Sequence, residues 1–248
     1  PARRVRRALA SRLDRWSNAL ADVVESDRRL ACNGCGRSVA AFTRFGGRPT
    51  ICPACGSRSK ERFVLALLDE GRLDLRKGGR FLHVAPSERH VAARMRERGE
   101  YVAVDLQPRT YGGAEVRALD LRDLWRRSEE FGTFDLVYAS HVLEHIVDDR
   151  AALTAVRQSL ADRGGELWAL VPLADGATDD GDGSETVRER ERRFGQWDHV
   201  RQYGEDFGDR LVDGGFSVQR FDIDVFPART AVRFGLSEDD VLWRCQTT

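Results

Sequence analysis

The sequence predicts an α/β protein, with a mostly parallel sheet wound by helices on both faces and a small zinc-binding segment before it. From about residue 78 onward, short apolar strands alternate with helices, a rhythm typical of parallel sheets. Near the start, two Cys-x-x-Cys pairs are separated by 16 residues, a spacing typical of a zinc ion held by four thiolates. A chain of 248 residues is long enough for one α/β domain and a small appendage.

The first 62 residues contain two predicted elements. Residues 3–25 place an apolar side chain at every third or fourth position, which predicts an amphipathic helix packed on the body of the protein. Its apolar stripe consists of Val5, Leu9, Leu13, Trp16, Leu20 and Val24. We therefore expect a helix within residues 1–29, a zinc ribbon over residues 30–62 and the α/β core over residues 63–248.

The four predicted zinc ligands are Cys32, Cys35, Cys52 and Cys55. The two-residue gap within each pair lets both sulfurs reach one ion, and the glycine after each pair, Gly36 or Gly56, can take the tight turn. Four thiolates leave no open coordination position, so the predicted zinc is structural rather than catalytic.

The predicted core elements follow in order along the chain. Strands are expected at residues 80–85, 101–105, 116–119, 134–139, 166–171, 216–225 and 241–246, and helices at residues 60–70, 88–98, 149–160 and 204–212, with a further helix beginning at His141. Residues 174–200 break this rhythm with many Asp, Gly, Glu and Arg residues. An insertion of this kind is either a disordered loop or a lid over a site.

The net charge of zero hides two oppositely charged parts. Residues 1–62 hold 14 Lys and Arg against 5 Asp and Glu, and the rest of the chain holds 26 against 35. The basic end favours contact with nucleic acid, although an arginine-rich composition with solvated helix faces explains it equally. No stretch approaches the ~20 apolar residues of a membrane span, so no membrane partner is expected. No signal peptide is visible, and the knuckle spacing leaves only Cys245 outside, which favours a reducing cytoplasm over disulfides.

Several blocks of the core resemble, in order, those of the class I S-adenosylmethionine-dependent methyltransferases. The blocks are RFLHVAP (80–86), YVAVDL (101–106), FDLVYASHVLEHI (134–146), GGELWALVP (164–172) and DGGFSV (213–218). The resemblance covers residues 78–246 and implies a Rossmann-like sheet of seven strands, S-adenosylmethionine as cofactor, and methyl transfer. Two further blocks, ICPACGSRSKER (51–62) and FGQWDHVRQYGEDF (194–207), are similar to a subgroup with a cysteine-rich segment before the core.

The turn after the first core strand departs from the family pattern. Members usually carry a GxGxG-like run there, which lets the backbone approach the cofactor closely. This chain has no glycine in that turn and places Ala85, Pro86 and Ser87 in it, after His83. Because alanine and serine are small, we expect Ala85, Pro86 and Ser87 still to contact the cofactor.

The remaining cofactor residues are predicted at the ends of later strands. Asp105 ends the second core strand, where a carboxylate can accept two hydrogen bonds from ribose hydroxyls. Leu106, the next residue, is predicted to contact the cofactor with it. The resemblance places adenine contacts at Asp120, whose neighbours Leu119 and Leu121 can flank the ring. Asp105 and Asp120 are also residue types common in turns. Ser140 and His141, at the end of the fourth core strand, are expected beside the methionine part of the cofactor.

The same strand end begins a His-x-x-Glu-His pattern formed by His141, Glu144 and His145. On a helix these three residues would share one face. The pattern is similar to an inverted zinc-protease motif, but it directly follows a methyltransferase-like strand, so we do not predict proteolysis. A second, divalent metal ion on this face is an alternative to a structural or cofactor-facing role.

The catalytic prediction falls on His199, just after the insertion. An imidazole with a near-neutral pKa suits removal of a proton from an acceptor hydroxyl. Arg201 is expected to bind an acidic substrate, and Trp197 and Tyr203 to line its pocket. The alternative is that His199 is bonded to Asp198 or to the backbone within a packed loop.

The sequence thus leaves three functions open. The first is a methyltransferase for a small-molecule acceptor, transferring to oxygen, with a structural zinc ribbon. The second is an RNA methyltransferase that uses the basic N-terminal lobe, which the negative charge of the core disfavours. The third is a catalytically silent binding protein whose altered turn no longer holds the cofactor, which the retained Asp105 disfavours. The sequence predicts no particular oligomeric state.

Overall fold

The computed structural model describes residues 30–45, 48–112, 115–162 and 164–247, which form two compact units. Unit 1 contains the described residues up to Leu73 together with Asp222–Asp240, and unit 2 contains Asp74–Phe221 and the chain from Val241 onward. The predicted helix over residues 3–25 lies outside the described residues. Within the described residues, no helix is long and apolar enough to cross a membrane.

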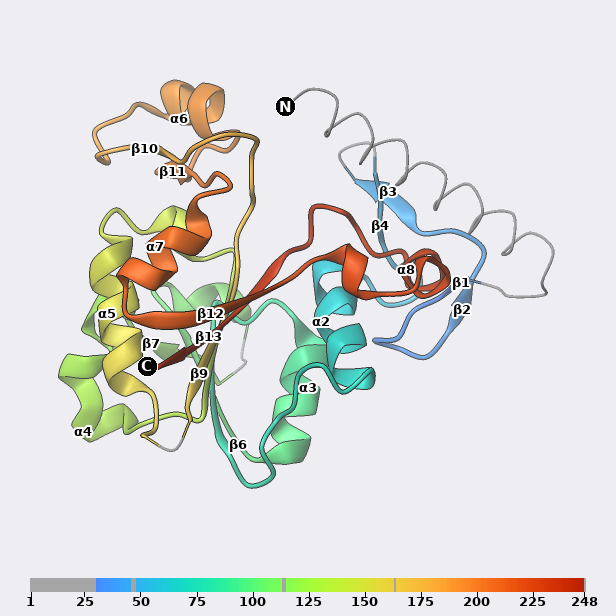
Figure 1. The fold of residues 1–248 in the computed structure, drawn as a ribbon, viewed down its shortest axis with the longest axis horizontal. Helices are drawn as coiled ribbons and strands as arrows, with labels where there is room; N and C mark the ends of the chain where they lie inside the picture. Colours follow the sequence, from blue (N-terminus) through green and yellow to red (C-terminus); the bar gives the residue numbers. More distant parts are fainter. Residues whose placement is uncertain (1–29, 46–47, 113–114, 163, 248) are drawn as a thin grey trace. The chain divides into compact units, whose positions relative to one another are not determined.

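Unit 2 is built on a seven-stranded sheet, drawn in the centre of Figure 1. Its strands are β5 (Arg80–Val84), β6 (Glu100–Asp105), β7 (Arg117–Ala118), β8 (Leu136–Ser140), β9 (Glu166–Leu170), β12 (Phe216–Phe221) and β13 (Leu242–Thr247). The order is β12-β13-β9-β8-β5-β6-β7. Six of these strands run in the same direction, and only β13 runs in the opposite direction. The predicted mostly parallel, Rossmann-like sheet is confirmed.

Helices cover this sheet on both sides. They are α3 (Arg89–Arg98), α4 (Ser128–Phe131), α5 (Asp149–Ser159) and α7 (Phe207–Asp213), with single 3₁₀ turns η1 (Pro108–Tyr111), η2 (Leu121–Asp123), η3 (Trp125–Arg127) and η4 (Leu143–His145). A further helix, α6 (Val187–Phe194), belongs to the insertion after β9 and does not cover the sheet. In Figure 1, α5 and α7 lie on one side of the sheet and α3 on the other. Every residue of β8 is buried, as expected for a central strand covered on both faces.

The strand order reverses between β5 and β8, which are neighbours in the sheet. After β5 the chain builds outward to β6 and β7, and after β8 it builds the other way to β9. Ligands of open α/β sheets bind outside the carboxyl ends of the strands at such a point. The fold therefore directs attention to the turns that follow β5, β6 and β8.

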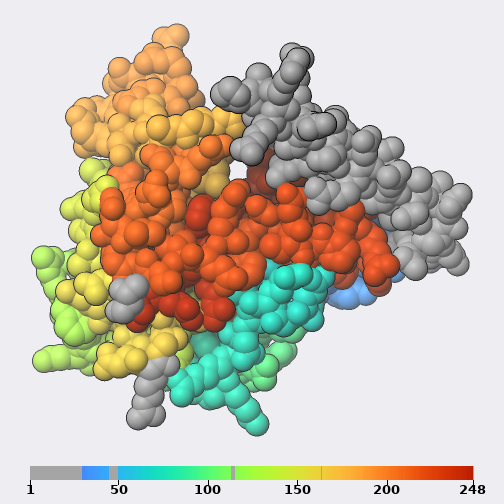
Figure 2. Space-filling model, in the orientation of Figure 1, coloured from blue at the N-terminus to red at the C-terminus, as the bar shows by residue number. Residues whose placement is uncertain are grey.

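The insertion after β9 is ordered rather than a disordered loop. It contains β10 (Asp179–Asp180), which pairs with β11 (Arg201–Gln202), and α6, whose N-terminus carries a capping box formed by Thr186 and Glu189. Asp180 also pairs with Arg210 of α7 at 3.0 Å. Figures 1 and 2 show this orange segment packed beside α7.

Unit 1 combines two small hairpins with two helices. The hairpins are β1 (Leu30–Ala31) with β2 (Ser38–Val39) and β3 (Thr43–Phe45) with β4 (Arg48–Ile51), and the helices are α2 (Ser59–Asp69) and α8 (Ala228–Phe234), with a 3₁₀ turn η5 (Ile223–Val225). Phe63 of α2 meets Phe226 edge to face, with ring centroids 5.4 Å apart.

Two local predictions are wrong. The strand predicted over residues 216–225 ends at Phe221, because Asp222–Asp240 form part of unit 1, between β12 and β13. The helix predicted to begin at His141 is a single 3₁₀ turn, η4, and His141 itself has a φ of 56°. That left-handed φ is incompatible with a helix start.

Candidate functional site

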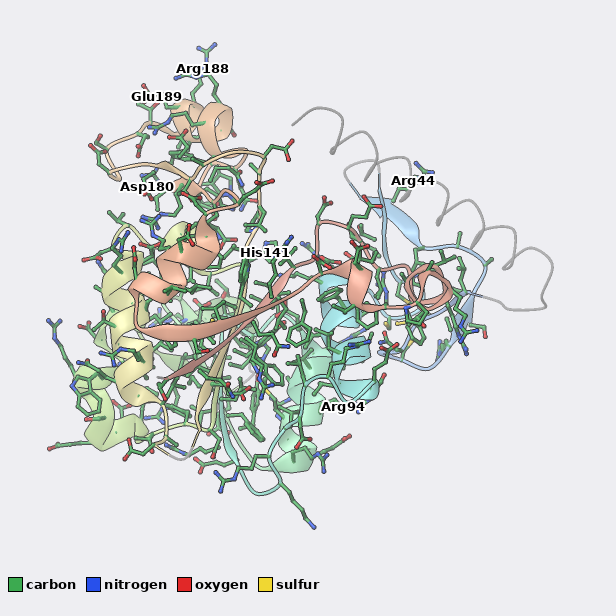
Figure 3. The ribbon with its side chains drawn as sticks, viewed as in Figure 1. Arg44, Arg94, His141, Asp180, Arg188 and Glu189 are labelled. Atoms are coloured by element: carbon green, nitrogen blue, oxygen red, sulfur yellow. The ribbon has the colours of Figure 1, made fainter. Side chains whose placement is uncertain are left out.

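A cavity of about 560 Å³ opens at the carboxyl ends of β5, β6 and β8. Its lining comes from the turns after these strands and from the end of the insertion: Val84, Ala85, Asp105, Leu106, Gln107, Thr110, Leu119, Asp120, Leu121, Arg122, His141, Val142, His145, Ile146, Val147, Trp197 and Asp198. Figure 3 labels His141 at the end of the sheet that faces the insertion. A volume of this size suits a cofactor or another small molecule.

Asp105 presents a half-buried carboxylate at the end of β6. Its Oδ1 accepts a hydrogen bond from the backbone N–H of Gln107 at 2.6 Å, and its Oδ2 accepts one from the Tyr111 hydroxyl at 2.9 Å. Burial, together with the hydrogen bond to Asp105, raises the pKa of Tyr111, so this hydroxyl stays a donor. The carboxylate is thus held in one orientation with lone pairs left for a further donor.

The wall beside Asp105 is apolar with one charged pair. Leu106, Leu119 and Leu121 line it, and Leu106 is 68% exposed. The Asp120 carboxylate accepts bidentate hydrogen bonds from the Arg122 guanidinium, at 2.6 Å on Oδ2 and 3.0 Å on Oδ1, and this partner lowers the pKa of Asp120. An aromatic ring system fits between such leucines.

The turn after β5 replaces glycine with a strained alanine. Ala85 has a φ of 50°, in the left-handed region that favours glycine, and it lines the cavity. The N–H of Ser87 donates to the Ala85 carbonyl at 2.8 Å, which closes the turn across Pro86. Pro86 and Ser87 do not line the cavity, so only Ala85 of these three predicted residues reaches it.

A buried polar cluster supports this turn from behind. Glu88 is 2% exposed and accepts a hydrogen bond from the Ser140 hydroxyl at 3.0 Å. Its other oxygen lies 3.3 Å from Nε2 of His83, whose Nδ1 lies 3.1 Å from the Tyr101 hydroxyl. Ser140, predicted at the cofactor, therefore bonds to Glu88 instead. The contacts of Glu88 with Ser140 and His83 were not predicted, because a single acidic residue near a strand end has no distinctive sequence pattern.

The turn after β8 carries two histidines that line the cavity. His141 lies with Nδ1 3.4 Å from Oε1 of the buried Glu144, and its side chain is 38% exposed. His145 is held by its Nδ1, which lies 3.2 Å from the backbone carbonyl of Asp198. Trp197 and Asp198, from the end of the insertion, line the cavity with them.

The other predicted catalytic and substrate residues lie behind this wall. His199 is 7% exposed, with Nδ1 3.2 Å from the Phe194 carbonyl, and its ring packs edge to face on His145 at 4.8 Å. Burial, followed by the proximity of His145, lowers the pKa of His199. His199 therefore contacts a residue of the cavity without lining the cavity.

Arg201 and Tyr203 are internal, so the structure corrects their predicted contact with substrate. Arg201 is 2% exposed and donates to the carbonyls of Leu143, Ile146 and Val147, which fixes the η4 turn. Tyr203 is fully buried, and its hydroxyl donates to Asp149. A run of aromatic and charged residues has the same sequence pattern in a substrate loop as in a buried polar network, so the sequence alone does not distinguish the two.

In unit 1, the four predicted zinc ligands come together. One sulfur from each of Cys32, Cys35, Cys52 and Cys55 lies within 4.8 Å of the others, and Cys32 and Cys52 are buried. The two knuckles have matching hydrogen bonds: Gly36 N–H donates to the Cys32 carbonyl at 2.7 Å, and Gly56 N–H to the Cys52 carbonyl at 2.8 Å. This arrangement is a closed four-cysteine site of the kind that holds structural zinc.

A buried arginine beside the cluster fits that interpretation. Arg62 is fully buried and donates to the carbonyls of Ser57, Thr50, Phe234 and Gly235. Burial lowers the pKa of Arg62, and nearby thiol groups and Asp240 oppose that shift. A zinc ion with four thiolates carries a net negative charge, so a buried guanidinium complements it.

Comparison with known proteins decides the family. A protein-family profile described as "Methyltransferase domain" matches residues 57–212, more than half of the chain. The chain belongs to this methyltransferase family. The predicted assignment to the class I S-adenosylmethionine-dependent methyltransferases is thereby confirmed. The search of curated proteins gave no match.

Solved structures share the fold of this methyltransferase. A SAM-dependent methyltransferase from Archaeoglobus fulgidus is 13% identical at a TM-score of 0.50, covering 75% of this chain and 94% of its own. An S-adenosylmethionine-dependent methyltransferase from Mesorhizobium loti is 17% identical at 0.48, covering 71% and 94%. Phosphoethanolamine N-methyltransferase 2 from Haemonchus contortus, in complex with S-adenosyl-L-methionine, is 14% identical at 0.46, covering 77% and 53%.

The residues of the methyltransferase cavity fit S-adenosylmethionine. Asp105 offers a fixed carboxylate for a diol, and the leucine wall beside it suits a purine. Ala85 has a φ of 50°, in the left-handed region that glycine adopts most readily, so the turn takes a glycine-like conformation although it contains no glycine. The family's cofactor is therefore S-adenosylmethionine here as well, and the cavity lined by Asp105 and Ala85 has the chemistry to accept it.

Proposed function

We propose that this methyltransferase transfers a methyl group to an oxygen atom of a small molecule with an apolar body. The observation that carries the proposal is the composition of one cavity. Asp105 and the leucine wall follow β6 and β7, on one side of β5, and form one end; His141 and His145 follow β8, on the other side of β5, and form the other end with Trp197. The first end suits the nucleoside of the cofactor, which leaves the second end for the acceptor.

The rim of the cavity supports an acceptor with an apolar body. Of the six exposed large hydrophobic side chains among the described residues, three line this cavity: Leu106, Val147 and Trp197, which are 68%, 47% and 59% exposed. Exposed apolar side chains grouped at a concave surface mark a ligand site. Trp197 and Val147 belong to the acceptor end.

The charge of the chain favours a small molecule over RNA. The residues after 62 hold 26 Lys and Arg against 35 Asp and Glu, and this negative balance opposes a phosphate backbone. Methyl transfer to RNA through the basic N-terminal residues remains the alternative that the acceptor experiment below tests.

The chemistry requires an aligned nucleophile and a place for its proton. When bound, S-adenosylmethionine supplies a methyl group on a sulfonium, ready for an in-line nucleophile. His141 lines the cavity, and the Glu144 carboxylate, 3.4 Å from its Nδ1, favours the tautomer with the proton on Nδ1, in which Nε2 is the basic nitrogen. We therefore assign the general base to His141 rather than to His199, which packs on His145 and does not line the cavity.

The domain organisation is part of the proposal. We propose a structural zinc ribbon within residues 30–62 and a lid formed by the insertion at residues 174–200, which brings Trp197 and Asp198 to the cavity. Lids of this kind exclude water from the reaction. We propose a cytoplasmic location, because the five cysteines form no disulfide, and a reducing compartment keeps the four knuckle cysteines available as zinc ligands.

The test combines calorimetry with an acceptor screen. The full chain is titrated with S-adenosylmethionine and its demethylated product, and is then incubated with hydroxylated and carboxylated small molecules or with RNA. Binding of both ligands and methyl transfer to a small-molecule oxygen are expected. Absence of binding would favour the silent binding protein, and transfer to RNA alone would favour the nucleic-acid alternative.

His141→Gln tests the assignment of the base. The variant is expected to lower kcat by about 10²–10⁴ while leaving the cofactor Kd nearly unchanged, because general-base catalysis contributes that much. His90→Gln, a matched change on α3 outside the cavity lining, is expected to retain full activity. Full activity of His141→Gln would show that alignment alone drives the reaction.

A further inference from the structure

Three side chains with metal-binding atoms converge at the acceptor end of the cavity. A carboxylate oxygen of Glu144 and one ring nitrogen each of His145 and His199 lie within 4.8 Å of one another. Glu144 and His145 belong to η4, and His199 belongs to the loop before β11. The fold thus brings together two segments that are far apart in the chain. His141 approaches Glu144 but is not part of this set.

Both histidines are oriented as metal-binding histidines are. Nδ1 of His145 lies 3.2 Å from the Asp198 carbonyl, and Nδ1 of His199 lies 3.2 Å from the Phe194 carbonyl. An Nδ1–H that donates to a carbonyl leaves Nε2 as a lone pair for a metal ion. The Asp198 carboxylate, 3.5 Å from the same Nδ1 of His145, adds the negative second partner common at such sites.

The carboxylate of the set is buried and its turn is fixed. Glu144 is 1% exposed, and its backbone carbonyl accepts from the Val200 N–H at 2.9 Å. Arg201 holds the same turn through three carbonyls, and its own charge is met by Asp180 at 2.7 Å and Asp149 at 3.7 Å. Burying a carboxylate is costly, and a cation bound to it offsets that cost.

We propose that Glu144, His145 and His199 bind a divalent transition-metal ion, at a site separate from the four-cysteine cluster. Two neutral imidazoles and one carboxylate suit Zn²⁺, Co²⁺, Mn²⁺ or Fe²⁺, whereas Mg²⁺ and Ca²⁺ prefer oxygen ligands alone. Three protein ligands leave coordination positions open. Since His145 lines the cavity, these positions face the acceptor end.

The ion gives the acceptor end a specific chemistry, and this part rests on the proposed function. An acceptor hydroxyl bound to the ion is more acidic, and His141 takes its proton. The oxygen lone pair then forms the C–O bond, and the C–S bond breaks with its electron pair going to sulfur. The ion is neither oxidised nor reduced. Acceptors that bind metal through adjacent oxygens are therefore the expected class.

Metal stoichiometry of the full chain tests the site without any acceptor. Zinc-loaded protein is dialysed until only the cysteine-bound ion remains, and is then titrated with Co²⁺, with Mg²⁺ as the comparison. One additional Co²⁺ per chain is expected, with visible bands that lack intense sulfur-to-cobalt charge transfer. Mg²⁺ is expected not to compete. Binding of no second ion would overturn the proposal.

Matched variants locate the ion. Glu144→Gln and His145→Gln are each expected to weaken the second site more than about 100-fold, beyond what changes outside the ligand shell cost, while keeping the cysteine-bound zinc. His90→Gln is expected to keep both ions. Because Glu144 is buried, its variant is checked by thermal denaturation, and His145, with a side chain 31% exposed, provides the second variant. An unchanged Co²⁺ affinity in both variants would overturn the site.

The two proposals fail in different assays. If the metal proposal is wrong, the chain binds no ion beyond the cysteine-bound zinc, while the cofactor titration and the acceptor screen still report cofactor binding and methyl transfer. Conversely, a chain that binds the second ion but transfers no methyl group to any small molecule contradicts the proposed acceptor and leaves the metal site standing. Full activity after selective removal of the second ion would overturn the role of the ion in activating the acceptor.

Discussion

The knuckles and the cavity both contain left-handed backbone, but different residue types adopt it in the two places. In the cysteine-rich unit, the residue after each knuckle is glycine, with φ 71° at Gly36 and 76° at Gly56. At the cavity of unit 2, the residues are Ala85, with φ 50°, and His141, with φ 56°. Glycine takes this region freely, whereas other residues pay about 1–2 kcal/mol.

This difference separates a site that only has to fold from a site that has to present side chains. The knuckles need tight turns around a metal, and glycine forms them without strain. The ends of β5 and β8 keep strained residues whose side chains line the cavity. Backbone strain of this kind concentrates at functional sites, so Ala85 and His141 mark the cavity independently of its lining.

The largest predicted effect is loss of zinc from the knuckles. Cys52→Ser removes one buried thiolate of the cluster, and a structural zinc site contributes on the order of 10 kcal/mol to the folding of a small metal-dependent unit. We expect the variant to lose its cysteine-bound zinc and to melt at a much lower temperature. Elemental analysis and thermal denaturation measure the two effects.

The fifth cysteine provides the control for this prediction. Cys245 is buried in β13, outside the cluster, and burial raises the pKa of its thiol. Cys245→Ala is expected to retain the zinc. If Cys52→Ser melts like the unchanged protein, the knuckle turns hold themselves without metal, and the contrast with the cavity loses its basis.

The second prediction concerns a buried acid in unit 1. Burial raises the pKa of Asp240 to about 6 from 3.8, although Ser59 and Arg62 act in the opposite direction. The folded state therefore keeps a proton that the unfolded state releases, so stability falls as the pH rises from about 4 to about 6. Two pKa units correspond to about 3 kcal/mol of unfolding free energy.

Asp240→Asn isolates this contribution. Between pH 4 and pH 7, the free energy of unfolding is expected to fall by about 3 kcal/mol more in the unchanged protein than in the variant, as measured by denaturant unfolding. Asp239→Asn, at the exposed neighbouring position, is expected to follow the unchanged protein. Parallel profiles for the chain and Asp240→Asn would mean that Asp240 titrates normally.

The third prediction moves to the cavity. Asp105→Ala removes the fixed carboxylate at the end of β6, and a hydrogen bond to a charged group contributes about 1.5–3 kcal/mol. We expect S-adenosylmethionine affinity to fall about tenfold or more by calorimetry, with little change in the melting temperature. Asp123→Ala, a nearby acid outside the cavity lining, is the matched control. Equal affinities would place the nucleoside elsewhere.

The elements that the sequence predicted best are those fixed by neighbours in the chain. The knuckles depend on ligands three positions apart, and the central strands on continuous apolar runs, so spacing and composition are sufficient. The η4 turn was mistaken for a helix because its shape depends on Arg201, a distant residue that donates to its carbonyls. For the same reason the approach of His199 to Glu144 and His145 was not visible in the sequence.

The smallest predicted effects test the opening contrast directly, beginning with the knuckles. Gly36→Ala introduces a methyl group with no atom within 4 Å of it, so only the left-handed backbone is penalised. We expect a net loss of up to about 1.6 kcal/mol with the zinc retained, because the less flexible unfolded chain offsets about 0.4–1 kcal/mol of a backbone penalty of about 1–2 kcal/mol. Gly56→Ala, in the same open surroundings, is expected to match it. Thermal denaturation measures both, and unequal losses would show that the two knuckles are not equivalent.

Ala85→Gly reverses the substitution at the cavity. Removing the methyl group relieves about 1–2 kcal/mol of backbone strain, while the freer unfolded chain takes back about 0.4–1 kcal/mol. A net gain of up to about 1.6 kcal/mol is therefore expected, with about 2–4 °C in Tm for each kcal/mol. Ala85→Val, with a branched side chain at the same φ, is expected to destabilise instead. If Ala85→Gly gains stability while its cofactor Kd rises, the strained methyl group contributes to binding; if the Kd is unchanged, the alanine is only a tolerated substitute for glycine. A loss of stability in Ala85→Gly would show that Ala85 is not strained, and the contrast between knuckles and cavity would fail at this position.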